Sequence, residues 1–224
     1  MNIALANSFA RIAEAAGIDV GDVIAIANQH PRVDIHQPGS GVGGHCIPLA
    51  PWFLVEAFPQ VSGLLREARK INDGQPAWLL DRAETAGLSR GARIAILGLS
   101  YRGDIDDPRE SPSDILIDEA LNRGYTLNVH DPLVDERHLD LDKYRFARRV
   151  SEAVAGVEAV FVMTAHSVYK SMNPDELLSG GATIVVDGRR VLAADALADA
   201  DAVLIQCGAA PREGKARLAG IAGE

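Results

Sequence analysis

The spacing of apolar residues changes near residue 90, and this change constrains the fold more than any other feature of the sequence. Up to about Leu88 apolar residues recur at helical spacing, which predicts helices over residues 2–16, 20–29, 48–58 and 62–86. Beyond Arg90, short apolar runs alternate with helical stretches; the runs cover residues 93–97, 126–130, 159–164, 183–187 and 202–207. Such alternation is typical of parallel β-α-β units. We therefore predict an α/β fold with a helical segment over 1–88 and a small Rossmann-like parallel-sheet domain over 89–224.

Several helix ends are marked by the residues that suit them. Asp19 and Ser111 are predicted N-caps, and Pro112 follows Ser111 at the first helical position, where a missing N–H does no harm. Within the predicted helix 62–86, Pro76 suggests a kink, and Gly87 closes the helix. The segment 30–47 reads as a non-helical insert.

Composition excludes some classes of function. The formal net charge is -9 and the isoelectric point is near 5.1, so the overall field repels nucleic acid and anionic membranes. No apolar run reaches the roughly 18 to 20 residues that cross a bilayer, and the first residues lack a signal-peptide pattern, which predicts a cytoplasmic protein. Cys46 and Cys207 lie far apart without metal-ligand spacing, so neither a disulfide nor a zinc site is expected.

The segment 38–46 reads PGSGVGGHC and contains the glycines Gly39, Gly41, Gly43 and Gly44. It follows a polar stretch rather than a strand, so a dinucleotide fingerprint is excluded by context. Closely spaced glycines permit positive φ and close backbone approach, and we expect successive N–H groups to form a cradle for polar or anionic ligand groups. If Pro48 is the first residue of the next helix, Cys46 lies beside a helix N-terminus, which favours a nucleophilic thiolate. A buried, inert cysteine is the alternative.

The same region carries a resemblance. The stretch HPRVDIHQPGSGVGGHCIPLAPWFL, residues 30–54, resembles the active-site segment of the UDP-glucose/GDP-mannose dehydrogenases. Agreement continues through NIALAN at 2–7, ARKINDGQPAW at 68–78, ILGLSYRGDIDDPRESPS at 96–113, VHDP at 129–132 and VVDGRRVL at 185–192. The chain is thus similar to the central and C-terminal parts of that family.

The resemblance implies two successive NAD-dependent oxidations of a sugar C6 alcohol to a carboxylate, with Cys46 as the nucleophile that holds the aldehyde and then the thioester. A thiolate suits this task because it adds reversibly to an aldehyde. The GGHC form with PWF after it is similar to the branch that oxidises UDP-N-acetylhexosamines, UDP-N-acetyl-D-mannosamine above all. The segment 1–88 then corresponds to the dimerisation part with the cysteine loop, and 89–224 to the UDP-sugar-binding domain.

The resemblance also assigns roles to individual residues. It implies substrate contacts for Gly41, Gly43, Gly44, Tyr101, Arg102 near the diphosphate, Arg189 at the nucleotide end, and Arg32 reaching the substrate of a neighbouring subunit. Arg109 corresponds to an arginine that approaches the nicotinamide cofactor. A homodimer follows from Arg32, and we expect it to form through the apolar faces of the N-terminal helices at Ile3, Phe9 and Ile12. Read alone, each arginine has a solvated-surface alternative.

Other polar residues carry weaker signals. His130 and His166 stand at predicted strand ends, where packing or capping is the expected role. Asp104, Asp106 and Asp107 form an acidic cluster that could attract Mg²⁺, but such loop carboxylates are more often caps, and we expect no metal site.

Two departures from the family limit what the resemblance implies. The NAD-binding domain and the lysine and asparagine that stabilise the oxyanion would lie upstream of Met1, so we expect NAD to be bound mainly by a domain absent from this chain, present upstream or in trans. Ala50 stands where relatives carry an aspartate that handles water and protons, so thioester hydrolysis should be impaired even with an NAD-binding domain in trans. Because nothing in this chain is expected to hold NAD productively, we expect no NADH from it alone. A non-catalytic UDP-sugar-binding or dimerising module is the alternative, and an unrelated Rossmann-like binding domain is a third.

Overall fold

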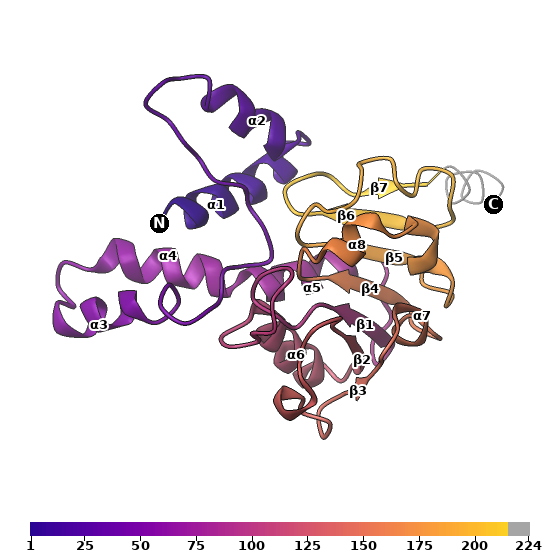
Figure 1. Cartoon of the computed structure of the whole chain (residues 1–224). Helices are drawn as coiled ribbons and strands as arrows, with labels where there is room; N and C mark the ends of the chain where they lie inside the picture. The colour runs from indigo at the N-terminus through magenta and orange to yellow at the C-terminus, as the bar shows by residue number, and fades with distance from the viewer. Residues whose placement is uncertain (215–224) are drawn as a thin grey trace.

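The computed structural model describes residues 1–214, in which five helices precede a seven-stranded sheet with further helices on its faces (Figure 1). The helices are α1 (Asn2–Ala15), α2 (Val20–Ala27), α3 (Ala50–Ala57), α4 (Gly63–Asp73), α5 (Gln75–Thr85), α6 (Pro112–Asn122), α7 (Val150–Ala153) and α8 (Ser167–Ser171), with 3-10 turns η1 (Glu136–His138) and η2 (Pro174–Leu178). The strands are β1 (Arg93–Leu97), β2 (Thr126–His130), β3 (Arg145–Phe146), β4 (Ala159–Val162), β5 (Ile184–Asp187), β6 (Val203–Gln206) and β7 (Arg212–Glu213).

The sheet has the order β3-β2-β1-β4-β5-β6-β7, and only the β6–β7 pair is antiparallel. The first six strands have the doubly wound order 3-2-1-4-5-6, so the predicted α/β fold is confirmed. The chain leaves β1 towards β2 and β3 and then returns to β4 on the other side of β1. The reversal places a topological switch point at the carboxyl ends of β1 and β4, where ligands bind in open sheets of this kind.

The strands are buried on both faces because their side chains alternate between two separate cores. In β1, Ile94 and Ile96 face the core formed with α5 and α6, whereas Ala95 and Leu97 face the core formed with α7, α8 and η2. Parallel strands covered by helices on both sides are expected to be continuously apolar. This explains why the strands beyond Arg90 were found from short apolar runs rather than from alternation.

A third cluster joins the first two helices to the far edge of the sheet. Ala10 of α1 and Val20 of α2 pack with Cys207, which follows β6. Gly208 permits this contact: its φ is +78°, and a Cβ there would lie 2.8 Å from the Ala10 Cβ. Arg190 adds an ion pair to Asp19 at 2.8 Å. The N-terminal helices are therefore fastened to the sheet domain rather than tethered by α5 alone.

Several local predictions were wrong in detail. The predicted helix 62–86 is two helices that meet at Gly74, and Pro76 lies in the first turn of α5, where its ring and missing N–H are tolerated. The strands β3 and β7 have two residues each and were missed, because so short a run leaves no periodic pattern. Helix α5 shares the core of the sheet through Leu79 and Leu80, and the division of the chain at residue 88 stays a prediction.

The predicted N-caps are confirmed. Asp19 accepts a hydrogen bond from the Gly21 N–H and begins α2, and Ser111 accepts one from the Ser113 N–H and begins α6. Among the described residues no helix is both long enough and apolar enough to span a lipid bilayer.

Candidate functional site

The loops that follow β1 and β4 meet at the switch point and fill it. Gly98 has a φ of +99°, and a Cβ at this position would lie 2.6 Å from Thr164 Oγ1. The Thr164 hydroxyl donates to the Ser100 carbonyl at 2.7 Å, and the Ser113 hydroxyl donates to the Gly98 carbonyl at 2.7 Å. The loop 98–111, which carries Tyr101, Arg102 and Arg109, is therefore held to its neighbouring strand and helix.

The cysteine loop, residues 38–46, lies across the carboxyl ends of the central strands. The Ser40 hydroxyl donates to the Met163 carbonyl just beyond β4 at 3.1 Å. The buried amide of Gln75 donates to the Gly39 carbonyl, and the Gly39 N–H donates to the side chain of Asn7. On the next residues, the Val42 N–H and C=O are both bonded by the Asn72 side chain. Side chains from α1, α4 and α5 thus fix the path of the loop.

The glycines of this loop allow neighbouring backbone and side chains to approach the loop closely. A Cβ on Gly43 would lie 2.9 Å from the Glu110 carbonyl carbon, and one on Gly44 would lie 3.0 Å from the Tyr101 ring. Gly41 and Gly44 have the positive φ values that were expected, +116° and +101°. The Gly44 N–H donates to the Arg109 carbonyl at 3.1 Å.

The expected cradle of successive N–H groups takes a different form. The N–H groups of Gly39, Val42 and Gly44 are already bonded to Asn7, Asn72 and Arg109, so these three do not point at a ligand. The glycines instead let the loop lie flat on the sheet loops, and substrate contacts at Gly41, Gly43 and Gly44 stay a prediction.

Cys46 is exposed at the end of the loop. The helix after it begins at Ala50 rather than Pro48, so the predicted helix start was two residues early, and Pro51 occupies the first turn instead. The Ala50 N–H nevertheless donates to the Cys46 carbonyl at 2.9 Å, which keeps the thiol one turn before α3. The buried, inert alternative describes Cys207 instead, because burial raises the pKa of that thiol to about 12.

His45 is a neighbour of the thiol that the motif reading passed over. Its Nδ1 lies 3.3 Å from the Cys46 Sγ, and both side chains are exposed. The only sequence signal was the dipeptide itself, since adjacency in the chain does not show that two side chains face one another.

Arg109 stands beside the cysteine loop and is held by Asp107. Its Nε and Nη2 donate to the Asp107 carboxylate at 2.8 and 2.6 Å. The hydrogen bond to Asp107 raises the pKa of the Arg109 guanidinium, and the charges of Asp107, Tyr101 and Cys46 add to the rise. The same hydrogen bond lowers the pKa of Asp107 to about 2. A positive group thus lies on the loop that contacts the cysteine loop at Gly44.

Arg189 lies under the cysteine loop. Its Nε donates to the Met163 carbonyl at 2.9 Å, and its Nη1 lies 3.3 Å from the position of a Cβ on Gly39. The buried carboxylate of Asp187 orders this turn by accepting from the N–H groups of Arg189 and Leu192. Burial lowers the pKa of the Arg189 guanidinium. The side chain is part-buried beneath the cysteine loop, and its contact with a nucleotide stays a prediction.

The remaining predicted arginines are exposed. Arg102 projects from the same loop as the part-buried Tyr101. Arg32 lies on the loop between α2 and the cysteine loop, which runs outside the first two helices and away from the sheet (Figure 1). The structure therefore brings Tyr101, Arg109 and Arg189 to the cysteine loop and leaves Arg32 outside that cluster.

Asp131 is a site residue that sequence reasoning passed over. Its buried carboxylate accepts hydrogen bonds from the backbone N–H groups of Leu99 and Ser100 after β1, and from those of Leu133 and Val134 after β2. His166 Nε2 lies 3.1 Å from the same carboxylate. This side chain therefore sets the start of the loop that carries Tyr101, Arg102 and Arg109.

The other polar residues at strand ends have protein partners. Buried His130 lies 2.8 Å from the Tyr169 hydroxyl, and His166 Nδ1 accepts from the Asp104 N–H. In the acidic cluster, Asp104 accepts from Ser167, Asp107 from Arg109, and Asp106 from the Asp135 N–H. These carboxylates act as caps of loops and helix starts.

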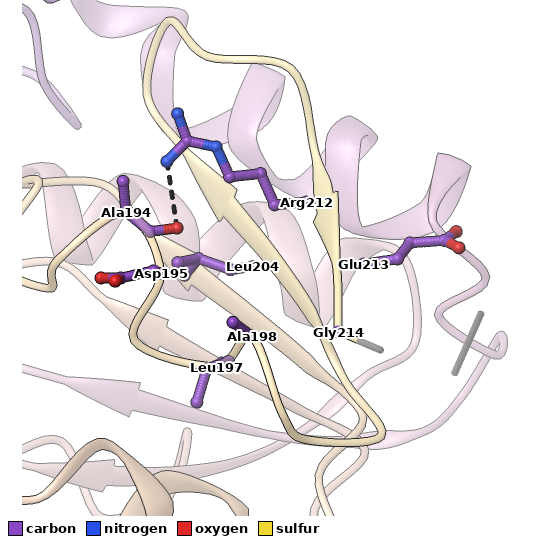
Figure 2. A pocket seen from close by; sticks show the side chains of 8 residues that line it. All are labelled: Ala194, Asp195, Leu197, Ala198, Leu204, Arg212, Glu213 and Gly214. Carbon is purple, nitrogen blue, oxygen red and sulfur yellow. Dashed lines mark hydrogen bonds between the residues drawn. The ribbon is translucent and has the colours of Figure 1, made fainter. Parts of the chain in front are cut away.

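A hollow of about 490 Å³ lies at the β7 edge of the sheet. Arg212 donates there to the Ala194 carbonyl (Figure 2). Its lining consists of Ala194, Asp195, Leu197, Ala198, Leu204, Arg212, Glu213 and Gly214. None of the residues singled out from the sequence lies there, so the cysteine loop remains the candidate site.

Comparison with known proteins is consistent with this geometry. Residues 1–74 match the model of the UDP-glucose/GDP-mannose dehydrogenase family, central domain, and residues 95–194 match that of the UDP binding domain. The UDP-N-acetyl-D-mannosamine dehydrogenase of Methanococcus maripaludis is 39% identical over 181 residues, which are 79% of this chain and 40% of that relative. The NDP-N-acetyl-D-galactosaminuronic acid dehydrogenase of Ralstonia solanacearum is 36% identical over 200 residues, 88% of this chain and 46% of that relative.

Solved structures give the same picture. A UDP-D-ManNAc dehydrogenase from Pyrococcus horikoshii superposes with a TM-score of 0.77 and 34% identity, over 92% of this chain and 48% of that one. The NDP-N-acetyl-D-galactosaminuronic acid dehydrogenase from Methanosarcina mazei superposes with a TM-score of 0.81 and 29% identity, over 95% of this chain and 48% of that one. The chain thus spans less than half the length of the relatives that it matches.

Proposed function

The chain belongs to the UDP-glucose/GDP-mannose dehydrogenase family, and from this premise we propose that it forms the substrate-handling part of an NAD-dependent UDP-N-acetylhexosamine 6-dehydrogenase. The proposed substrate is UDP-N-acetyl-D-mannosamine, whose C6 alcohol is oxidised to the uronate. The observation that carries the proposal is the exposed Cys46 thiol, which a glycine-rich loop seats over the switch point of the sheet. The names of the relatives support the choice of an N-acetylated sugar.

In this proposal Cys46 holds the C6 carbon. The thiol adds to the aldehyde as a new C–S bond forms, the carbonyl π electrons move to oxygen, and the S–H proton leaves to a base. Arg102 faces the diphosphate from the loop after β1, and Arg189 lies at the nucleotide end beneath the cysteine loop. Tyr101 packs on Gly44 and keeps the loop against the sheet.

Two observations support placing the nicotinamide dinucleotide outside the crevice of this sheet. Gly98 stands where a glycine-rich turn of a dinucleotide site would begin, but it packs on Thr164, and the cysteine loop covers the adjoining strand ends. We therefore place the dinucleotide on a further domain, either continuous with this chain or supplied in trans, with Arg109 turned towards it.

We expect calorimetric titration with UDP-N-acetyl-D-mannosamine to detect binding. We expect Arg102→Ala to weaken it about tenfold, because Arg102 is exposed and its charge-assisted hydrogen bond should lie at the lower end of the usual range of roughly 1.5–3 kcal/mol. Arg149→Ala is the matched control: it removes an exposed arginine that precedes α7, and we expect unchanged affinity. Absence of any nucleotide-sugar binding would refute the proposed function, and equal affinities for Arg102→Ala and the parent would remove Arg102 from the site.

A non-catalytic UDP-sugar-binding module is the second candidate, and Ala50 favours it. Its N–H donates to the Cys46 carbonyl, so Ala50 lies one turn after the thiol, at the position where the family resemblance implies a carboxylate. The two candidates differ in the fate of the C6 aldehyde. The test compares how well the C6 aldehyde and the C6 alcohol of the nucleotide sugar protect Cys46 from alkylation when each occupies the site equally. If the chain is part of an enzyme, the aldehyde should protect Cys46 more strongly. If it is only a binding module, the two should protect equally.

We also propose a homodimer formed through the helical segment. Of the three residues that the sequence suggested, Ile12 is 62% exposed, whereas Phe9 packs against the third core cluster and Ile3 is part-buried. The exposed apolar face instead continues through Leu5 of α1 and Leu64 of α4, which line a groove of about 400 Å³. We expect sedimentation equilibrium at micromolar concentration to give twice the chain mass, and Leu64→Glu to give a monomer. A monomeric parent would contradict this interface.

A further inference from the structure

The imidazole of His45 and the thiol of Cys46 face the same side of the cysteine loop. Neighbouring residues in a strand or helix normally point in different directions. Here the backbone bends through residues 44–46, with Gly44 at a φ of +101°, and the bend brings His45 Nδ1 to 3.3 Å from Cys46 Sγ. Both side chains are exposed, so a proton taken up by the ring can pass on to water.

The backbone on either side of this pair is anchored. Before it, Gly44 packs on the Tyr101 ring, and its N–H donates to the Arg109 carbonyl. After it, the Cys46 carbonyl accepts from the Ala50 N–H. The segment that carries the imidazole and the thiol is therefore anchored on both sides, and this anchoring keeps the two side chains close together.

The other polar groups near the pair have partners of their own. The Arg109 carbonyl accepts from the Gly44 N–H, which places the loop of Arg109 next to the pair. The Asp107 carboxylate is paired with Arg109, so it is not available as a base. Ala50 has no proton acceptor in its side chain. Within residues 1–214, His45 is the residue whose side chain brings a titratable nitrogen into contact with the thiol.

We propose that His45 is the proton acceptor that activates Cys46, and thereby fills the place in proton handling that Ala50 leaves open. As Sγ forms its bond to the aldehyde carbon, the S–H bond breaks, the proton moves to His45 Nδ1, and the carbonyl oxygen gains the π electrons and then a proton from water. The identity of the aldehyde as a nucleotide sugar rests on the proposed function. The activation of the thiol does not.

The test is the rate at which iodoacetamide alkylates Cys46 at pH 7, followed by intact mass. In this reaction Sγ bonds to the methylene carbon, iodide leaves, and the thiol proton goes to the base. A free thiol is only a few per cent ionised at pH 7, so a base that accepts its proton can raise the alkylation rate about tenfold. We expect His45→Gln to slow alkylation about tenfold. Cys207 is buried and does not compete, and Cys46→Ser reports any residual labelling.

Two measurements separate proton transfer from a change in loop shape. His36→Gln alters an exposed histidine of the preceding loop and is expected to leave the rate within twofold of the parent. At pH 10, where an ordinary thiol is ionised without help, parent and His45→Gln are expected to react equally, and added imidazole should restore His45→Ala at pH 7.

An unchanged rate in His45→Gln at pH 7 would overturn the proposal, and so would an equal slowing at pH 7 and pH 10. Iodoacetamide requires no nucleotide sugar. A chain that fails to bind UDP-sugars but shows the His45 effect therefore refutes the proposed function alone, and a chain that binds them without the effect refutes only the role of His45.

Discussion

Replacing Gly43 with alanine is expected to lower the free energy of unfolding by about 3 kcal/mol, the upper end for an overpacked site, and to abolish detectable UDP-sugar binding. The added Cβ would overlap the Glu110 carbonyl oxygen and would lie 2.9 Å from its carbon. Both are backbone atoms, and Glu110 already has a φ of +50°, so neither side can yield cheaply. Urea denaturation and calorimetric titration measure the two effects.

The loop could instead lift from the sheet and leave global stability intact. In that case hydrogen exchange at Gly44, whose N–H donates to Arg109, is expected to accelerate. Gly63→Ala is the matched control, because Gly63 begins α4 and a Cβ there meets nothing within 4 Å. Its unfolding free energy should change by less than about 0.5 kcal/mol. A Gly43→Ala protein with parental stability, exchange and affinity would show that the close approach is unimportant.

Asp131→Ala is expected to destabilise the fold by about 4 kcal/mol. The substitution leaves four backbone N–H groups at two loop starts without their acceptor, and each buried, unpaired donor costs roughly 1–3 kcal/mol before water or relaxation compensates. Asp142→Ala removes an exposed aspartate and should change stability by less than about 0.5 kcal/mol. If Asp131→Ala lowers the free energy of unfolding by less than about 1 kcal/mol, the two loops keep their structure without this carboxylate.

The contribution of the Asp131 carboxylate should also appear in the pH dependence of the free energy of unfolding. Burial alone would raise the pKa of Asp131, but hydrogen bonds from His166 and from the N–H groups of Ser100 and Leu133 outweigh it and hold the pKa well below its usual range. Since the folded pKa is depressed, the stabilisation is complete above the unfolded pKa of about 3.9 and is lost as pH falls below it. The parent should therefore lose more stability than Asp131→Ala on acidification from pH 5 to pH 2.

The sequence predicted those parts of the structure that depend on neighbours in the chain. The strand at 93–97 and the helix that begins at Pro112 after Ser111 followed from local spacing and capping. Cys46 was found because a cluster of glycines precedes it, and the resemblance to a family gave that cluster a meaning.

Contacts between segments that are distant in the chain could not be predicted from the sequence. Asn72 and Gln75 read as ordinary helix residues, yet their amides hold the backbone of the cysteine loop 30 and 36 residues earlier. Arg189 and Arg190 are adjacent and alike, but one bonds the Met163 carbonyl and the other pairs with Asp19. Only the folded chain distinguishes such residues, because the distinguishing partners are fixed by topology and not by local pattern.

The bond from Ser40 to Met163 joins residues that are 123 positions apart. A contact of such long range contributes to stability only after the loop-closure entropy of the intervening chain has been overcome. We therefore expect the cysteine loop to dock late in folding, once β4 is in place. On this expectation the emerging polypeptide presents an ordinary cysteine during synthesis, and the proposed activation of the thiol arises only in the folded protein.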